Sequence, residues 1–137
     1  VRRKLNPIYD EFKDKKVLLV DDSIVRGTTM KEIVAMCYKA GASKVSVASA
    51  AAEVCFPNVY GIDMAAKKDL IASNKSNNEI KEFLGCDNLV YQSLSDLEDS
   101  VLELNPDLRA VEKSIFDGNY PTNISQEYLE ELEETRG

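Results

Sequence analysis

The stretch from residue 17 to residue 29 constrains the fold of this chain more than any other part of the sequence. It begins with four aliphatic residues, Val17–Val20, a short unbroken run that predicts a strand buried on both faces of a parallel sheet. Two adjacent carboxylates, Asp21 and Asp22, follow the strand and open a polar loop (residues 21–27) that ends in Gly27. A buried strand that runs into such a loop is typical of the ligand-binding edge of an open α/β sheet.

The residues after the polar loop predict an α/β fold. Apolar residues recur at helical spacing over 28–40, Gly41 suits a helix C-terminus, and Lys44–Ala50 has the pattern of a second strand. Two strands joined by a helix form a right-handed βαβ unit with parallel strands. We also expect a loop over 51–64, helices over 67–73, 77–84, 95–104 (with a capping box from Ser95 to Glu98) and 124–135, a third strand over 88–92 and a turn over 117–119.

Composition narrows the class of protein. The 137 residues are 44% apolar and 30% charged, which is typical of one soluble globular domain, and no apolar run approaches the roughly 20 residues of a membrane helix. The absence of histidine excludes an imidazole base and a His-ligated zinc site from this chain. Three cysteines without paired spacing favour the reducing cytoplasm, and a net charge of −7 disfavours a general nucleic-acid-binding role. The chain opens with Val1 and has no apolar leader, so we expect a piece of a longer polypeptide without a signal peptide.

The polar loop has the chemistry of a phosphate site. A helix N-terminus at the carboxyl end of a strand offers unpaired N–H groups and a partial positive charge to an anion. Gly27 permits backbone geometry that a β-carbon would block, and the hydroxyls of Ser23, Thr28 and Thr29 add donors. Arg26 could be an electrostatic partner, or its side chain could face away. The loop therefore predicts phosphate binding.

The paired acids require a second explanation, because carboxylates repel phosphate. Asp21 and Asp22 suit sugar hydroxyls or Mg²⁺, a hard cation that prefers oxygen ligands. A sugar phosphate satisfies both halves of the loop. Taken singly, Asp22 or Ser23 could simply cap the helix and Gly27 could be a turn residue; the full combination favours the ligand site.

Three segments carry a resemblance to a known family: residues 1–7, 20–29 and 57–64. They resemble the type I phosphoribosyltransferases and, more narrowly, the glutamine phosphoribosylpyrophosphate (PRPP) amidotransferases. The resemblance implies a partial type I phosphoribosyltransferase fold, a parallel sheet with flanking helices and a helical C-terminal extension. In that reading 1–16 is the end of a mobile loop and a connector, 17–104 is the α/β core, and 105–137 is the extension.

The resemblance also implies a reaction and its residues. Ammonia released from glutamine attacks C1 of PRPP and diphosphate leaves, which yields 5-phosphoribosylamine, the first committed step of purine synthesis. Asp21 and Asp22 would be the catalytic acids that contact the ribose hydroxyls and Mg²⁺. The 5-phosphate would lie against Ser23, Ile24, Val25, Arg26, Gly27, Thr28 and Thr29. Arg2, Arg3 and Lys4 match the end of the mobile loop that closes over PRPP; a solvated terminus is the equal alternative for them.

The departures from the family pattern define what this chain lacks. The glutaminase domain and the first part of the transferase domain are absent, so we expect the chain alone to be inactive. Some family members hold an iron–sulfur cluster; Asn58 stands at one cysteine position and no paired cysteines occur near Phe116, so no cluster is expected. The implied partners are PRPP, purine nucleotides, the missing domains and further copies in a homo-oligomer, without nucleic acid or membrane.

Two other functions remain open at this stage. The Val17–Ser23 segment also resembles the acidic pair of signalling receiver domains, with Asp63 as a candidate phosphoacceptor. A glycine- and threonine-containing loop is not needed in that family. A non-catalytic regulator that binds PRPP or a nucleotide on the same fold would carry the same polar loop.

Overall fold

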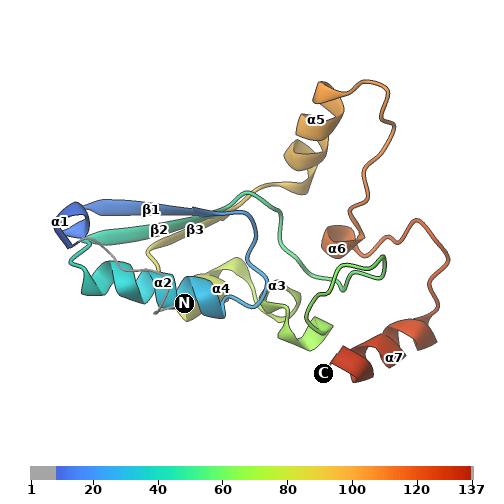
Figure 1. The fold of residues 1–137 in the computed structure, drawn as a ribbon, viewed down its shortest axis with the longest axis horizontal. Coiled ribbons are helices and arrows are strands. Elements are labelled where there is room, and N and C mark those ends of the chain that lie inside the picture. The colour runs from blue at the N-terminus through green and yellow to red at the C-terminus, as the bar shows by residue number, and fades with distance from the viewer. Residues whose placement is uncertain (1–8, 137) are drawn as a thin grey trace.

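The computed structural model describes residues 9–136, which form an α/β fold around a three-stranded parallel sheet (Figure 1). The strands are β1 (Lys16–Asp21), β2 (Lys44–Ser49) and β3 (Asn88–Tyr91), in the order β1-β2-β3. Val17 lies opposite Val45, and Val47 lies opposite Leu89. The predicted fold class, the three strands and their parallel pairing are confirmed.

Helices fill the connections between the strands and the C-terminal part of the chain (Figure 1). The expected helices are present, although the one expected over 67–73 is divided into a 3₁₀ turn and a short α-helix. The short helices α1 and α6 were not predicted; α6 ends where a turn over 117–119 was expected. The helices are α1 (Tyr9–Phe12), α2 (Thr28–Lys39), η1 (Lys67–Asp69), α3 (Ile71–Asn74), α4 (Asn77–Leu84), α5 (Leu94–Leu104), α6 (Ser114–Asp117) and α7 (Gln126–Arg136).

One face of the sheet carries the main core. Helices α2 and α4 lie against this face in Figure 1, and their buried side chains include Val34 and Ile80. Val45 and Val47 point into the same core from β2 and are almost fully buried. Apolar burial of this extent is the main source of the stability of the domain.

The opposite face of the sheet is uncovered, which corrects the prediction that β1 is buried on both faces. Leu18 and Val20 are 63% and 70% exposed, and Val90 on β3 is 60% exposed. The aliphatic run is real, but within residues 9–136 no helix packs over this side (Figure 1). Burial of a strand on both faces requires a second layer that local sequence does not show.

The caps of α4 and α5 differ from the sequence prediction. The capping box stands at α4, where Ser76 accepts a hydrogen bond from the N–H of Glu79 and the Glu79 carboxylate accepts one from the N–H of Ser76. At α5 the N-terminal cap is Ser93, which accepts from the N–H of Asp96 at 3.1 Å. Ser95 lies inside that helix, so the predicted capping box there is wrong. Ser93 is in an extended conformation, which suits a cap.

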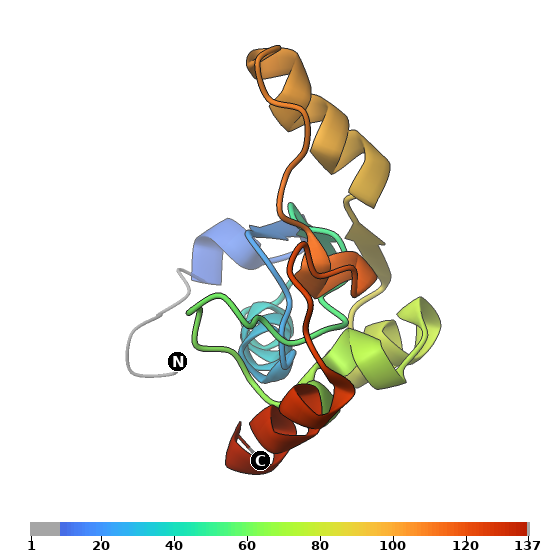
Figure 2. The same ribbon diagram turned by 90° about the vertical axis from the view of Figure 1, so that its right-hand side faces the viewer.

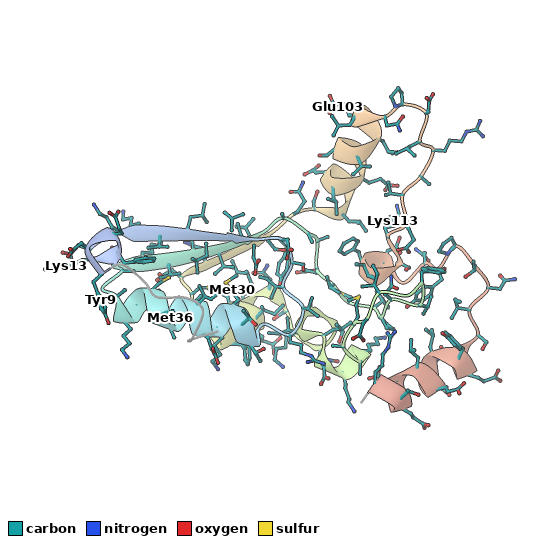
Figure 3. All side chains as sticks on the ribbon, viewed as in Figure 1. Tyr9, Lys13, Met30, Met36, Glu103 and Lys113 are labelled. Carbon is teal, nitrogen blue, oxygen red and sulfur yellow. The ribbon has the colours of Figure 1, made fainter. Side chains whose placement is uncertain are left out.

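The chain after β3 leaves the sheet and returns to it. Helix α5 projects from the body, with Glu103 towards its far end and Lys113 in the returning segment (Figure 3). The returning segment packs Ile115 and Phe116 on a second, smaller apolar cluster around Leu70. Figure 2 shows α7 on the opposite side of the molecule from α5. No helix within the described residues 9–136 is long and apolar enough to cross a membrane.

Candidate functional site

A cavity of about 750 Å³ opens at the carboxyl end of β1, where the polar loop leads into α2. Parallel strands direct their carboxyl ends to one edge of the sheet, the usual ligand position in such folds. Of the residues predicted over 21–29, all except Asp22 line this cavity. Its lining includes Asp21, Ser23, Ile24, Val25, Arg26, Gly27, Thr28, Thr29 and Met30, together with Asp63, Met64, Ala65, Thr135 and Arg136 from more distant segments.

Gly27 shapes the entry into α2. Its φ of +74° lies in the left-handed region, which favours glycine. A β-carbon built on Gly27 would lie 2.9 Å from Cδ1 of Ile71 and 3.2 Å from Cε1 of Phe83. Gly27 is also the N-terminal cap of α2 and supplies no side-chain acceptor. The N–H groups of the first turn therefore face the cavity edge without a side-chain cap, the arrangement that binds anions.

The two acids occupy different positions. Asp21 is the last residue of β1 and lines the cavity, whereas Asp22 is exposed and is not part of the lining. Oδ1 of Asp21 accepts a hydrogen bond from the N–H of Asp22 at 3.1 Å, and Oδ1 of Asp22 accepts one from the Ser23 hydroxyl at 3.2 Å. The structure therefore distinguishes Asp21, inside the cavity, from Asp22, at its rim.

Ile24 and Val25 shape the loop through packing. Ile24 is only 2% exposed and belongs to the main core, and Val25 packs on the second cluster. The carbonyl oxygen of Val25 accepts a hydrogen bond from the N–H of Ile71 at 2.9 Å. These anchors hold the loop backbone, and only its main-chain groups are available to a ligand at these two positions.

Arg26 is placed between the cavity and a neighbouring carboxylate. Arg26 lines the cavity, and its guanidinium lies 3.7 Å from the carboxylate of Asp69 on η1. Both side chains are largely exposed, so this ion pair contributes little and leaves Arg26 able to turn to a phosphate. Arg2, Arg3 and Lys4 lie outside the described residues.

The far wall of the cavity was mostly missed by sequence reasoning. Asp63, which the sequence offered as a candidate phosphoacceptor, lines the same cavity as Asp21. Asp63 lies in an irregular loop and not at the end of a strand. Arg136, from the last turn of α7, was not predicted. No local pattern links Arg136 with the polar loop, because the contact depends on where α7 packs.

The residues at the cavity suit Mg²⁺ held together with a phosphate ligand. This cation usually takes one or two carboxylates and completes its octahedron with water and substrate oxygens. Asp21 in the wall and Asp22 at the rim provide that donor set. Within residues 9–136 no cluster of three or more acidic or cysteine side chains could hold a metal by itself.

The burial and raised pKa of the cysteines are typical of unreactive thiols. Cys37 and Cys86 are buried and Cys55 is half-buried, all as free thiols. Burial raises the pKa of each thiol, and the nearby Glu53 carboxylate raises the pKa of Cys55 further. A raised pKa lowers the thiolate fraction, so these are packing residues.

Comparison with known proteins gives a consistent result. No protein-family model matches the sequence. The chain is 53% identical to amidophosphoribosyltransferase of Escherichia coli over 137 residues and 51% identical to that of Saccharomyces cerevisiae over 136 residues, in each case 99% of this chain. These matches cover 27% and 26% of the two relatives. A solved structure of glutamine PRPP amidotransferase from Bacillus subtilis, complexed with ADP and GMP, matches with a TM-score of 0.78 at 35% identity, over 91% of this chain and 29% of that one.

The likeness therefore extends over both sequence and fold, and it agrees with the family resemblance of the polar loop. The chain spans about a quarter of the length of the relatives it matches. The chain is a relative of the amidophosphoribosyltransferases over a segment that makes up about a quarter of their length.

Proposed function

We propose that this chain forms the part of an amidophosphoribosyltransferase that binds the 5-phosphate and the ribose of PRPP. One observation carries the proposal. The uncapped N-terminus of α2, reached through the left-handed Gly27, opens into the same cavity as the carboxylate of Asp21. An anion site beside a carboxylate fits a ligand that has a phosphate and hydroxyl groups.

The ligand would lie along the polar loop. The 5-phosphate would accept hydrogen bonds from the loop and first-turn N–H groups and from the hydroxyls of Ser23, Thr28 and Thr29, with Arg26 adding charge. Asp21 would accept hydrogen bonds from the ribose hydroxyls, with Asp22 at the rim. Mg²⁺ held by Asp21 and Asp22 would neutralise diphosphate charge when bound.

The reaction of the proposed parent enzyme is the displacement of diphosphate from C1 of PRPP by ammonia from glutamine. The new C1–N bond forms as the C1–O bond to diphosphate breaks, and the product is 5-phosphoribosylamine. The ribose becomes electron-poor at C1 as diphosphate departs, so the side chain of Asp21 beside the sugar would stabilise the developing positive charge. A fixed 5-phosphate also orients C1 towards the incoming ammonia.

The remaining functions belong to parts of the enzyme outside this chain. We propose that residues 17–104 are the transferase core, that 105–137 are its C-terminal extension, and that a glutaminase domain and the rest of the transferase act with them. Purine nucleotides as further ligands, a homo-oligomer and a cytoplasmic location are also part of this proposal. The B. subtilis relative was solved with ADP and GMP, which supports nucleotide binding.

The proposal is tested by calorimetric titration with PRPP and Mg²⁺. The protein titrated is the full-length protein, which is this chain together with the proposed remainder of the enzyme. The double variant Asp21→Asn, Asp22→Asn should bind at least about tenfold more weakly. The two side chains would lose the negative charge that strengthens hydrogen bonds from the sugar hydroxyls and that binds the metal ion. A double variant of the exposed Asp99 and Asp107, each changed to Asn, removes the same net charge far from the cavity and should bind normally.

Equal binding by the wild-type protein and the loop variant would disprove the role of the acids. Tight binding of PRPP without formation of 5-phosphoribosylamine by the full-length protein would instead favour the non-catalytic regulator. Labelling of Asp63 by acetyl phosphate would favour the receiver alternative.

A further inference from the structure

The last turn of α7 lies beside the proposed site although it is distant in sequence. Thr135 and Arg136 line the same cavity as the polar loop. No side chain of α7 is fully buried, although Leu129 and Leu132 are half-buried, so polar contacts at the C-terminal end of the helix contribute to its position. Two of those contacts come from Glu133 and Arg136.

Glu133 clamps the backbone of η1. Its Oε2 accepts a hydrogen bond from the N–H of Lys67 at 2.6 Å, and its Oε1 accepts one from the N–H of Lys68 at 2.9 Å. Both carboxylate oxygens are thus used on two successive backbone donors. Two hydrogen bonds from successive backbone N–H groups to one carboxylate attach the end of α7 directly to η1.

The clamped η1 is in turn attached to the polar loop. The N–H of Ile71, just after η1, donates to the carbonyl oxygen of Val25 at 2.9 Å. Asp69 on η1 faces the guanidinium of Arg26. A fixed η1 therefore supports the loop backbone that would cradle the phosphate.

Arg136 supports the opposite wall of the cavity. Its Nη1 donates to the carbonyl oxygen of Asn58 at 3.0 Å. Asn58 is only 2% exposed, and its side-chain oxygen accepts from the N–H groups of Tyr60 and Ile62 at 2.9 Å and 3.1 Å. This turn leads directly into Asp63, which lines the cavity.

The segment before α7 strengthens the same attachment. The hydroxyl of Tyr120 donates to the carbonyl oxygen of Pro57 at 2.8 Å, and the hydroxyls of Tyr60 and Thr122 lie 3.0 Å apart. The chain from 120 to 136 thus runs as a strap over the loop from 57 to 68, with hydrogen bonds made by Tyr120 at its start and by Glu133 and Arg136 at its end (Figure 2).

We propose that Glu133 and Arg136 are positioning residues for the proposed PRPP site. Glu133 acts through η1 on the polar loop, and Arg136 acts through Asn58 on the wall that carries Asp63. This proposal rests on the function proposed above, because it takes PRPP as the ligand of the cavity. Neither residue needs to touch the reacting atoms; each holds backbone that leads to the residues lining the cavity.

The first test measures PRPP binding, with Mg²⁺, by the full-length protein and its variants. Glu133→Ala and Arg136→Ala should each weaken binding about five- to tenfold. Without these contacts the loop is less ordered before binding, and the cost of ordering it reduces the free energy of binding. Arg136→Lys keeps a cationic donor and should recover part of the loss. Glu134→Ala, an exposed neighbour on α7, is the matched control and should bind as wild type.

The second test needs no ligand. Amide hydrogen exchange of residues 57–71 should become faster in Glu133→Ala and Arg136→Ala and remain unchanged in Glu134→Ala. Glu133→Gln, which keeps one neutral acceptor, should fall between wild type and Glu133→Ala. This milder variant keeps the test valid if the alanine variants fold poorly.

The outcomes separate the two proposals. Unchanged exchange in both alanine variants overturns the positioning role, and so does faster exchange with unchanged PRPP binding. A wild-type protein that does not bind PRPP overturns the proposed function instead, and the exchange of residues 57–71 then decides whether the strap holds the cavity wall. Faster exchange together with weaker binding, absent from the control, supports the positioning role.

Discussion

At the scale of single residues, two glycines with similar backbone angles have different constraints. Gly27 and Gly85 have φ values of +74° and +72°. A β-carbon on Gly85 would meet nothing within 4 Å, whereas one on Gly27 would meet the side chains of Ile71 and Phe83. The sequence indicates a loop residue with special backbone geometry at Gly27 and a helix end at Gly85, but only packing shows that Gly27 is also sterically confined.

We therefore expect Gly27→Ala to destabilise the protein more than Gly85→Ala. Each substitution forces a left-handed alanine, at about 1–2 kcal/mol, and Gly27→Ala adds the displacement of the Ile71 side chain. Urea denaturation of both variants measures the difference in the free energy of unfolding. Equal losses for the two variants would show that the contact at Gly27 relaxes without cost.

The two acids of the polar loop also differ at this scale. Asp21 lines the cavity and Asp22 is exposed at its rim, so Asp21→Asn should weaken PRPP binding with Mg²⁺ more than Asp22→Asn. A difference of about fivefold or more is expected, since a hydrogen bond to a charged group contributes roughly 1.5–3 kcal/mol. Titration calorimetry of the two single variants measures it. A larger loss in Asp22→Asn would mean that the ligand lies outside the cavity.

At the scale of elements, Asp87 joins a helix to the sheet. Its carboxylate accepts a hydrogen bond from the hydroxyl of Tyr38 on α2 at 2.6 Å and one from the N–H of Val45 on β2 at 2.8 Å. The Tyr38 bond first, and then the Val45 bond, hold the pKa of Asp87 below its ordinary range. Residue 87 directly precedes β3, so one side chain links three elements.

This link predicts a specific dependence of stability on pH. A carboxylate whose pKa is lowered on folding stabilises the protein above its unfolded pKa, and that contribution is lost as the pH falls through the folded value. The stability advantage of wild type over Asp87→Asn should thus be full above the ordinary pKa of an aspartate, roughly 4, and shrink as the pH falls below it. Urea denaturation at several pH values checks this.

Asp99→Asn, an exposed carboxylate of α5, is the control and should leave the pH dependence unchanged. If Asp87→Asn and wild type lose stability in parallel below pH 4, then the link to Tyr38 and Val45 is not made by the ionised form.

The bounds of a helix could be predicted from sequence where the residues that define them are close together in the chain. The bounds of α4 were predicted correctly, because its apolar spacing and Gly85 lie within a few residues of each other. The cap of α5 was misplaced by two residues, since Ser93 and Ser95 both have a cap-type side chain. Which serine caps the helix depends on the backbone angle at the end of β3, and that is set by the path of the chain away from the sheet.

At the scale of the whole molecule, the main feature is the apolar surface on the uncovered face of the sheet. Leu18, Val20 and Val90 are all more than half exposed. Val20 and Val90 lie in one row across the sheet, with the half-buried Ala48 of β2 between them. A contiguous apolar patch of this kind favours association with another surface. The chain expressed alone is therefore expected to self-associate.

The double variant Leu18→Thr, Val20→Thr should reduce self-association of the 137-residue chain. Both side chains are exposed, so the free energy of unfolding should change by less than about 1 kcal/mol, whereas Val45→Thr, in the core, should lose more. Sedimentation velocity over a range of concentrations measures association, and urea denaturation measures stability. Unchanged association in the double variant would place the contact surface elsewhere.

The sequence by itself determined the strands, most of the helices and the residues of the polar loop, because each depends on the spacing or conformation of neighbouring residues. The tertiary structure decided which acid enters the cavity, that Asp63 and Arg136 form its far wall, and that one sheet face is bare. These features join segments such as 21–27 and 133–136, whose meeting depends on packing across the whole fold. Local preferences hold no information about such distant contacts.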